Sequence, residues 1–361
     1  MLSPALNSSQ PRNPQGAAAR GGSLEAGARS IIENVKIFAG YFPALLALLL
    51  LIFPRTIFPS EEGHYKILEI KPQVFVWAAE DILEQEGDPK FNRAANAGFV
   101  ITPEGVVVVN TTNTPFNARG LLYEIRRHTD LPIRFVINTS ASPDAMLGNE
   151  AFTDFSPTIL STPAAATLMD RYRSELPRRI EDDWRLKEAM RGIHPTPPDK
   201  TFAQEMTLPL PGTPIKLINL GDGASPGNSV VYLPQSKVLF LGNLFENQYI
   251  PRMDSGNIRG WINTLRRVES WDADVFVPAH GEPGGRKQVE QFRQFLEWLL
   301  NQVQSRVQQG KSEQQIQDEL VPFQGYPWHA GELESQAVAS VYRQLTGSAK
   351  GASASTTATS P

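Results

Sequence analysis

Five short apolar runs, each next to a polar loop, constrain the fold of this 361-residue chain more than any other feature. Runs of this length are typical of buried strands, because a helix that buries one face needs roughly ten or more residues. The runs are Ile133–Ile137, Ile215–Leu220, Val230–Leu233, Val238–Leu241 and Val275–Val277.

A β-hairpin and several helices are expected around these strands. Gly98–Thr102 and Val106–Val109 are β-branched runs on either side of the turn residues Pro103–Gly105, which predicts the hairpin. Strands that alternate with helices indicate a layered α/β architecture. The first three helices are expected through Leu121–Ile125, at Ala164–Glu175 and at Ile180–Arg191.

The strongest helical pattern lies near the C-terminus. Apolar residues recur at helical spacing from Val289 to Val307, which is typical of a helix packed on a core. Gly310 provides a C-terminal stop, and Ser312 with Gln315 forms a capping box for a following helix. Two consecutive helices are therefore expected here.

A long apolar segment precedes the folded part. IFAGYFPALLALLLLIFP, residues 37–54, contains no charged residue and reaches bilayer-spanning length when it is extended past Arg55 to Phe58. Residues before it are mostly small or polar, a composition that cannot bury enough apolar surface to fold. The chain is thus predicted to consist of a disordered cytoplasmic arm (1–34), a transmembrane anchor (35–58), a globular domain (64–347) and a disordered tail (348–361).

Flanking charges predict the orientation of the anchor. Arg12, Arg20, Arg29 and Lys36 precede it, whereas Glu61 and Glu62 follow soon after it. Because positive charges stay in the cytoplasm, we expect the domain on the extracytoplasmic side, periplasmic or extracellular. A cleaved signal peptide is the alternative, but no small-x-small cleavage site follows the apolar core and the arm is long for an n-region.

Charge and cysteine content exclude several function classes. Lys and Arg number 34 against 38 Asp and Glu, a net charge of −4, so the chain lacks the basic surface that binding to nucleic acid requires. It contains no cysteine, which excludes disulfides, thiolate nucleophiles and cysteine-ligated metals.

Four segments between Asn96 and Gly347 resemble the motif set of metallo-β-lactamase-fold hydrolases. That family has T-H-x-H-x-D-H after a strand with G-N shortly downstream, then H-T-x-G-D, G-D and a final histidine. The corresponding segments here are TSASPDAMLGN from Thr139, ASPGNSVVYLP from Ala224, VLFLGN ending at Asn243 and VPAHGEP around His280. The resemblance implies an αββα sandwich.

Most metal-ligand positions of the family hold other residues here. Asp144 and His280 match metal ligands of the family, and Gly148 and Asn149 match the G-N pair of its first motif. NTT, residues 110–112, replaces the family's I-D-T-G, so Asn110 stands where an acid is common. The degenerate ligand positions are Ser140, Ser142, Ala145 and Ala224 in place of histidines and Asn243 in place of the bridging aspartate.

These substitutions oppose a dinuclear centre. Family members hold two divalent ions that lower the pKa of a shared water. Stable zinc sites use three or four good ligands, and only Asp144 and His280 are left, with Asn243 as a weak third. The leading hypothesis is therefore a membrane-anchored pseudoenzyme with no tightly bound cofactor, whose former active-site cleft binds a small molecule or a partner protein.

Two alternatives remain open from the sequence. The first is a hydrolase of the family that uses one weakly bound divalent ion, such as zinc, at Asp144 and His280. The second is metal-free hydrolysis with Ser140 or Ser142 as nucleophile, His280 as base and Asp144 as the orienting acid. Asp144 could also cap the helix after its loop. Tyr249, Trp261 and His329 are candidates to line the cleft.

Overall fold

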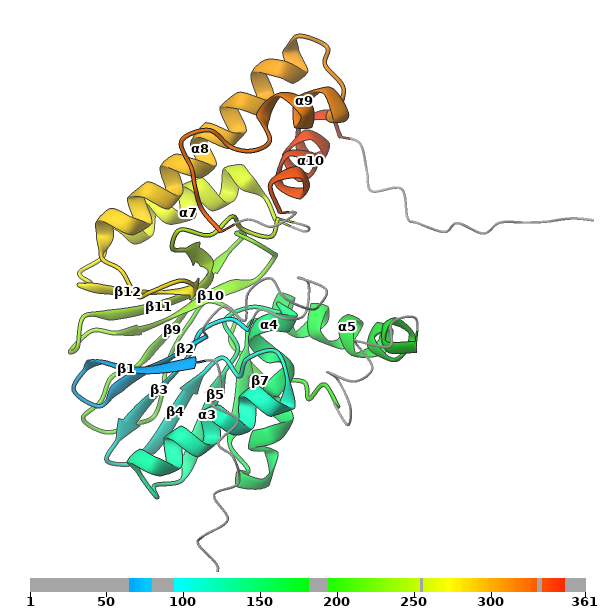
Figure 1. The fold of residues 1–361 in the computed structure, drawn as a ribbon. Coiled ribbons are helices and arrows are strands. Elements are labelled where there is room, and N and C mark those ends of the chain that lie inside the picture. Colours follow the sequence, from blue (N-terminus) through cyan, green and yellow to red (C-terminus); the bar gives the residue numbers. More distant parts are fainter. Residues whose placement is uncertain (1–64, 80–93, 182–193, 254–255, 330–332, 348–361) are drawn as a thin grey trace, which may run out of the picture. The chain divides into compact units, whose positions relative to one another are not determined.

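The computed structural model describes residues 65–79, 94–181, 194–253, 256–329 and 333–347 (Figure 1). The arm, the anchor and the tail expected at 1–34, 35–58 and 348–361 lie outside these ranges. Among the helices of the described ranges, none combines the length and the apolar composition needed to cross a bilayer.

The first sheet has seven strands in chain order. β1 to β4 pair antiparallel, and β4 to β7 pair parallel. The expected hairpin is confirmed as β3 and β4, which close at Thr102 and Gly105. β1, β2, β6 and β7 lie outside the runs expected to form strands. The strands are β1 Tyr65–Lys71, β2 Val74–Ala79, β3 Ala97–Thr102, β4 Gly105–Val109, β5 Ile133–Ile137, β6 Thr158–Ser161 and β7 Lys200–Thr201.

The second sheet has five strands in the order β12-β11-β10-β9-β8. β11 and β12 are parallel, and the other neighbours are antiparallel. Four expected runs lie in these strands, although β11 continues to Glu246 and β12 to His280, beyond their apolar parts. The strands are β8 Glu205–Thr207, β9 Lys216–Gly221, β10 Asn228–Leu233, β11 Val238–Glu246 and β12 Val275–His280.

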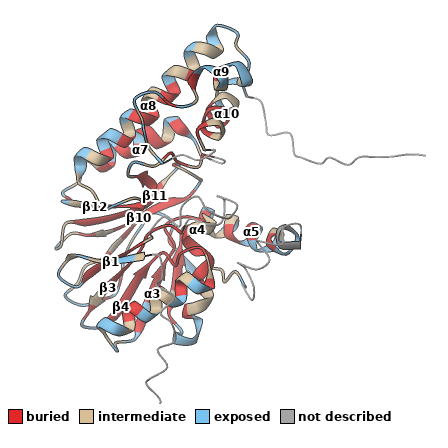
Figure 2. Ribbon diagram, viewed as in Figure 1, coloured by how far each residue is buried: buried red, intermediate tan, exposed pale blue. Residues whose placement is uncertain are grey.

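The two sheets share a core and are covered by helices on their outer faces, which gives four layers. Val76 and Val107 of the first sheet join Val231 and Phe240 of the second in one apolar cluster. Burying an aliphatic side chain contributes roughly 1.5–3 kcal/mol, so this cluster holds the sheets together. Figure 2 shows the buried residues concentrated on the strands and on the inward faces of the helices. The mixed α/β fold expected from the sequence is therefore confirmed.

Each outer face has its own helices. α3 packs its buried residues on the first sheet, and α7, α8 and α10 pack on the second. The helices are α3 Pro115–His128, α4 Pro143–Met146, the 3-10 helix η1 Leu147–Phe155, α5 Pro163–Glu181, α7 Ile258–Glu269, α8 Arg286–Gln308, α9 Glu313–Leu320 and α10 Leu333–Thr346.

The first of the two expected middle helices is longer than predicted. α5 continues through Pro177 to Glu181, whereas the sequence indicated an end at Glu175. A proline inside a helix is costly, but Leu176 is buried beside Met169 in an apolar cluster with the α4 region. This burial offsets the cost. Residues 182–193, which contain most of the second expected helix, lie outside the described ranges.

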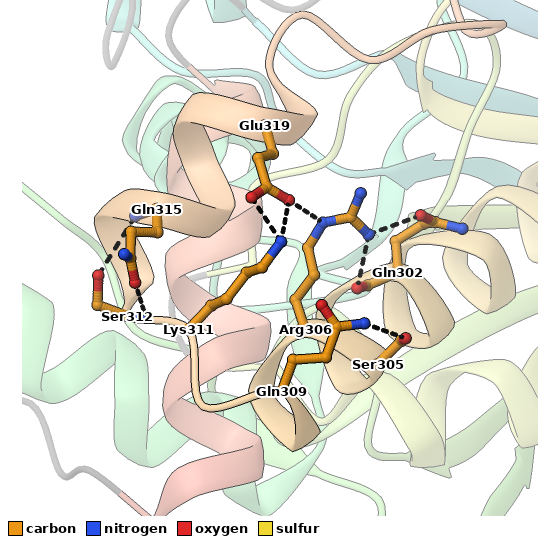
Figure 3. A network of polar contacts seen from close by, with 8 residues as sticks. All are labelled: Gln302, Ser305, Arg306, Gln309, Lys311, Ser312, Gln315 and Glu319. Atoms are coloured by element: carbon orange, nitrogen blue, oxygen red, sulfur yellow. Dashed lines mark hydrogen bonds and ion pairs between the residues drawn. The ribbon is translucent and has the colours of Figure 1, made fainter.

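The junction of α8 and α9 follows the expected pattern (Figure 3). The Ser312 hydroxyl accepts a hydrogen bond from the backbone N–H of Gln315, whose side chain accepts one from the Ser312 N–H. Across the turn, Glu319 accepts from Lys311 and Arg306, which lower its pKa in that order of importance. Because this network is exposed to water, it contributes little stability.

Candidate functional site

The loop after β5 is held by the polar end of β4. The Asn110 carboxamide oxygen accepts two hydrogen bonds from Thr139, one from its backbone N–H and one from its hydroxyl, both 3.0 Å long. Asn110 has a φ of 60°, a conformation that asparagine adopts more readily than most residues. Asn110 is therefore a structural support for the loop.

Ser140 and Asn243, two of the positions expected to have lost metal ligands, are hydrogen-bonded to each other. The Ser140 hydroxyl donates to the Asn243 carboxamide oxygen over 2.7 Å, and the same hydroxyl oxygen accepts from the Ser142 backbone N–H at 3.2 Å. Both side chains are buried. This hydrogen bond joins the β5 loop to β11. The Ser140 hydroxyl therefore donates to an amide oxygen, which cannot act as a general base.

His280 lies between two carboxylates. Its Nδ1 is 2.8 Å from an oxygen of Glu246 on β11, and its Nε2 is 3.4 Å from an oxygen of Asp144 on α4. The exposed side-chain fractions are 11% for His280, 21% for Asp144 and 5% for Glu246. The structure thus brings together the two predicted residues Asp144 and His280, and it adds Glu246.

The positive charge of His280 and the negative charges of Asp144 and Glu246 stabilise one another. Burial alone would lower the pKa of His280, but Glu246 and then Asp144 outweigh it and raise the pKa to about 9. Burial would likewise raise the pKa of Asp144, yet the contact with His280, followed by Ser142 and Arg252, lowers it. His280 is therefore an imidazolium at neutral pH, with a carboxylate at each ring nitrogen.

Sequence reasoning missed Glu246 and Asn96, which position His280. The Asn96 side-chain amide donates to the carbonyls of Pro278 and Gly281 at 3.2 and 2.8 Å, on both sides of the histidine. Glu246 is the one charged residue of strand β11, which it ends, and it is itself buried. A single charged residue at the end of such a run is the signal that could have identified it.

Asp144 does not cap its helix in the described structure. The N-cap of α4 is Ser142, and Asp144 lies in the first turn. One carboxylate oxygen of Asp144 faces His280, whereas the other is buried without a hydrogen-bond partner, as is His280 Nε2. Two buried polar atoms without hydrogen bonds therefore lie close together at this site.

The three residues expected to line the cleft lie in different environments. Tyr249 lies beside the site, with its ring centroid 6.0 Å from that of His280, and the exposed His329 stacks on Tyr249 at 4.6 Å. Trp261 is fully buried instead, and its indole N–H donates to the Leu244 carbonyl over 2.9 Å. Trp261 is thus a core residue.

The residues present do not fit the family's paired metal ions. Ala145 is packed with Ala95 and Ala279 in a small apolar cluster, and Ala224 packs against the core of the second sheet. The ring nitrogens of a histidine diverge, so Glu246 at Nδ1 cannot share an ion bound at Nε2. In the described part of the chain, no three His, Asp or Glu side chains are placed to hold a metal ion.

Comparison with known proteins identifies the family of this site. The model of the metallo-beta-lactamase superfamily matches residues 92–280. A linear primary-alkylsulfatase of Pseudomonas sp. (strain ATCC 19151) is 24% identical over 269 residues, 64% of this chain and 50% of the relative. A metallo-beta-lactamase type 2 of Bacteroides fragilis is 30% identical over 104 residues, 27% of this chain and 42% of the relative. The chain therefore spans half or less of these relatives.

Solved structures show the same fold. The stereoselective inverting sec-alkylsulfatase of Pseudomonas sp. aligns with a TM-score of 0.60 at 17% identity, over 80% of this chain and 51% of that protein. A metallo-beta-lactamase from Pontibacter korlensis aligns with a TM-score of 0.52 at 21% identity, over 64% of this chain and 99% of that protein. At these identities the likeness concerns the fold alone.

Proposed function

The chain belongs to the metallo-β-lactamase superfamily, and from this premise we propose that it is a non-catalytic member, a pseudoenzyme that uses its former active site for binding. The observation that carries the proposal is the Asp144–His280–Glu246 arrangement. A histidine ligates metal as the neutral ring. Here the raised pKa keeps His280 protonated, so an ion must first displace a proton from a favourable ion pair.

Ser140 supports the same proposal. A nucleophilic serine needs a base within hydrogen-bond reach. The Ser140 hydroxyl donates to Asn243, and both nitrogens of His280 face carboxylates. This geometry favours binding over metal-free hydrolysis by Ser140. Tyr249 and His329 beside the triad offer stacking surfaces for a small molecule or a partner side chain.

Metal titration tests the proposal. We expect the purified chain to carry far less than one metal ion per molecule and to melt at the same temperature in chelator and in excess zinc. A site filled at 100 times its Kd would add about 2.7 kcal/mol, which is a melting shift of several degrees. Stoichiometric, chelator-resistant metal in the purified chain would overturn the proposal.

A matched variant shows that the assay detects metal. Asn243→Asp restores a carboxylate at the position where the family has its bridging aspartate, and an aspartate can still accept the Ser140 hydrogen bond. Three donors approach the ligand number of stable zinc sites. We therefore expect this variant to gain a zinc-dependent rise in melting temperature that the unmodified chain lacks.

One observation favours a second candidate, a hydrolase with one weakly bound ion. The buried Asp144 Oδ1 and His280 Nε2 make no hydrogen bond, and both belong to the residues that match family ligands. The two candidates differ in one assay. Turnover of lactam, ester or sulfate-ester substrates that requires added metal and disappears in Asp144→Asn would favour the hydrolase.

We further propose that the apolar segment at 35–58 holds the chain in a membrane, with residues 64–347 outside the cytoplasm. The uncharged run and the basic residues before it support this orientation. The full chain is then expected to stay with the membrane fraction after alkaline carbonate extraction. Release into the carbonate supernatant would contradict the anchor.

A further inference from the structure

The segment between α9 and α10 returns to the candidate site. Residues 321–329, which we call the strap, leave the end of α9 and run back along α8 toward the second sheet (Figure 1). At its end, the His329 backbone N–H donates to the Gln248 carbonyl over 3.0 Å, and the His329 carbonyl accepts from the Ile250 N–H over 2.9 Å. The strap is therefore bonded to both chain neighbours of Tyr249.

One side chain fixes this end of the strap to the helices. Trp328 is half-buried and packs on the core of the second sheet. Its ring centroid lies 4.9 Å from that of Phe295 and 6.4 Å from that of Phe292, two buried residues of α8. Large rings in such contacts bury much apolar area in a defined geometry. Because His329 follows Trp328 directly, this contact determines where the His329 backbone meets the site.

The turn that carries Tyr249 is strained. Gln248 has a φ of 64°, in the left-handed region that L side chains rarely adopt. A residue other than glycine stays in such a conformation only where its surroundings hold it. Here the hydrogen bond from the His329 N–H holds the Gln248 carbonyl. Loss of that bond favours relaxation of Gln248 to a negative φ, which turns Tyr249 away from His280.

Tyr249 connects the strap to the charged residues of the site. Its ring centroid lies 4.6 Å from that of His329, with the ring planes 21° apart, and 6.0 Å from that of His280. The strap lies after residue 280, where the match to the superfamily model ends. This part of the rim is thus supplied by chain outside the matched region.

We propose that Trp328 is a positioning residue of the candidate site. By holding the strap against α8, it keeps the turn at Gln248 in its left-handed conformation and the Tyr249 ring beside His280. The inference rests on the proposed binding function for its consequence, because Tyr249 and His329 are the stacking surfaces of that proposal. The ring positions are measured without a ligand, so the two proposals are tested separately.

Histidine ring signals in an NMR spectrum report the position of Tyr249, because an aromatic ring shifts the resonances of rings that lie against it. The full chain in detergent has five histidines, so isotope labelling of the imidazoles gives a spectrum that single substitutions can assign. Tyr249→Leu defines the shifts that loss of the ring causes at His280 and His329. We expect Trp328→Leu to move both signals by more than half of those shifts and to leave the signal of His128 on α3 in place.

Two matched variants separate positioning from a general loss of stability. Trp271 is another half-buried tryptophan on the same core, and it packs on Tyr232 rather than on the strap. Trp271→Leu should therefore lower the melting temperature without moving the His280 and His329 signals. Trp328→Phe keeps an aromatic contact with α8 and should leave both signals in place.

Relief of the strain provides a rescue. Asparagine adopts a positive φ more readily than glutamine, so adding Gln248→Asn to Trp328→Leu should return the His280 signal toward its position in the unmodified chain. Unmoved signals in Trp328→Leu, or equal movement in Trp271→Leu, overturn the positioning role. Tightly bound metal in the purified chain would overturn the proposed function and leave this result unaffected.

Discussion

Replacing His280 with glutamine is expected to destabilise the domain by about 3–5 kcal/mol, because it leaves two buried carboxylates without their cation. Glu246 and Asp144 are 5% and 21% exposed, and both face the imidazolium. Glutamine keeps a similar volume and can donate one hydrogen bond, so the loss reflects charge rather than a cavity. A loss of this size is a large part of the stability of an ordinary domain.

Urea unfolding of His280→Gln and of the unmodified chain at pH 7 measures this loss of stability. His329→Gln is the matched control, since it makes the same change at an exposed histidine that stacks on Tyr249. We expect the control to cost less than about 1 kcal/mol. Equal stability of His280→Gln and the unmodified chain would show that the triad is not an ion pair.

The same triad predicts an alkaline loss of stability. The folded pKa of His280, about 9, lies above its ordinary 6.5. The stabilisation is therefore complete below pH 6.5 and disappears as the pH rises to about 9, a change of roughly 3 kcal/mol. The pKa of Asp144 is lowered instead, so its contribution is present above pH 3.8 and is lost as the pH falls through its folded pKa. His280→Gln should lack the alkaline decline.

Replacing Gly148 with alanine is expected to cost several kcal/mol and to displace the loop after β5. A Cβ at this position would overlap the Thr111 carbonyl oxygen and press on Ala118 of α3. Neither atom can move freely, because one belongs to the backbone and the other to a buried helix face. Only glycine therefore allows η1 to approach the end of β4 this closely.

Displacement at Gly148 should also break a buried amide network. Its neighbour Asn149 accepts from Thr111 at 2.8 Å and exchanges two hydrogen bonds of 2.9 Å with Asn138. Gly120→Ala is the control, since an added Cβ there meets the Tyr65 ring at 3.4 Å, an ordinary contact. Alanine should stabilise that helical position by up to about 1 kcal/mol. Thermal melts of the two variants should therefore shift in opposite directions.

The sequence alone determined several strands, one hairpin and the family of this protein. The apolar runs predicted β4, β5, β10 and β11 because a strand buried on both faces leaves a continuous apolar pattern. Turn and capping residues predicted the hairpin and the start of α9 because those signals act over a few residues. The motif spacing predicted that Asp144 and His280 follow buried strands, and it indicated the family. The structure has Asp144 in the first turn of α4 and His280 as the last residue of β12.

Tertiary structure alone decided the chemistry of the site. Ser140 and Asn243 are far apart in the chain, as are Asp144 and His280, and no local pattern shows that each pair is in contact. Glu246 was missed because its partner is reached only when β11 and β12 pair in parallel. The charge of His280 depends on burial and on the two carboxylates beside it. The pairing of β11 with β12 brings Glu246 there, and the packing of α4 against the end of β12 brings Asp144.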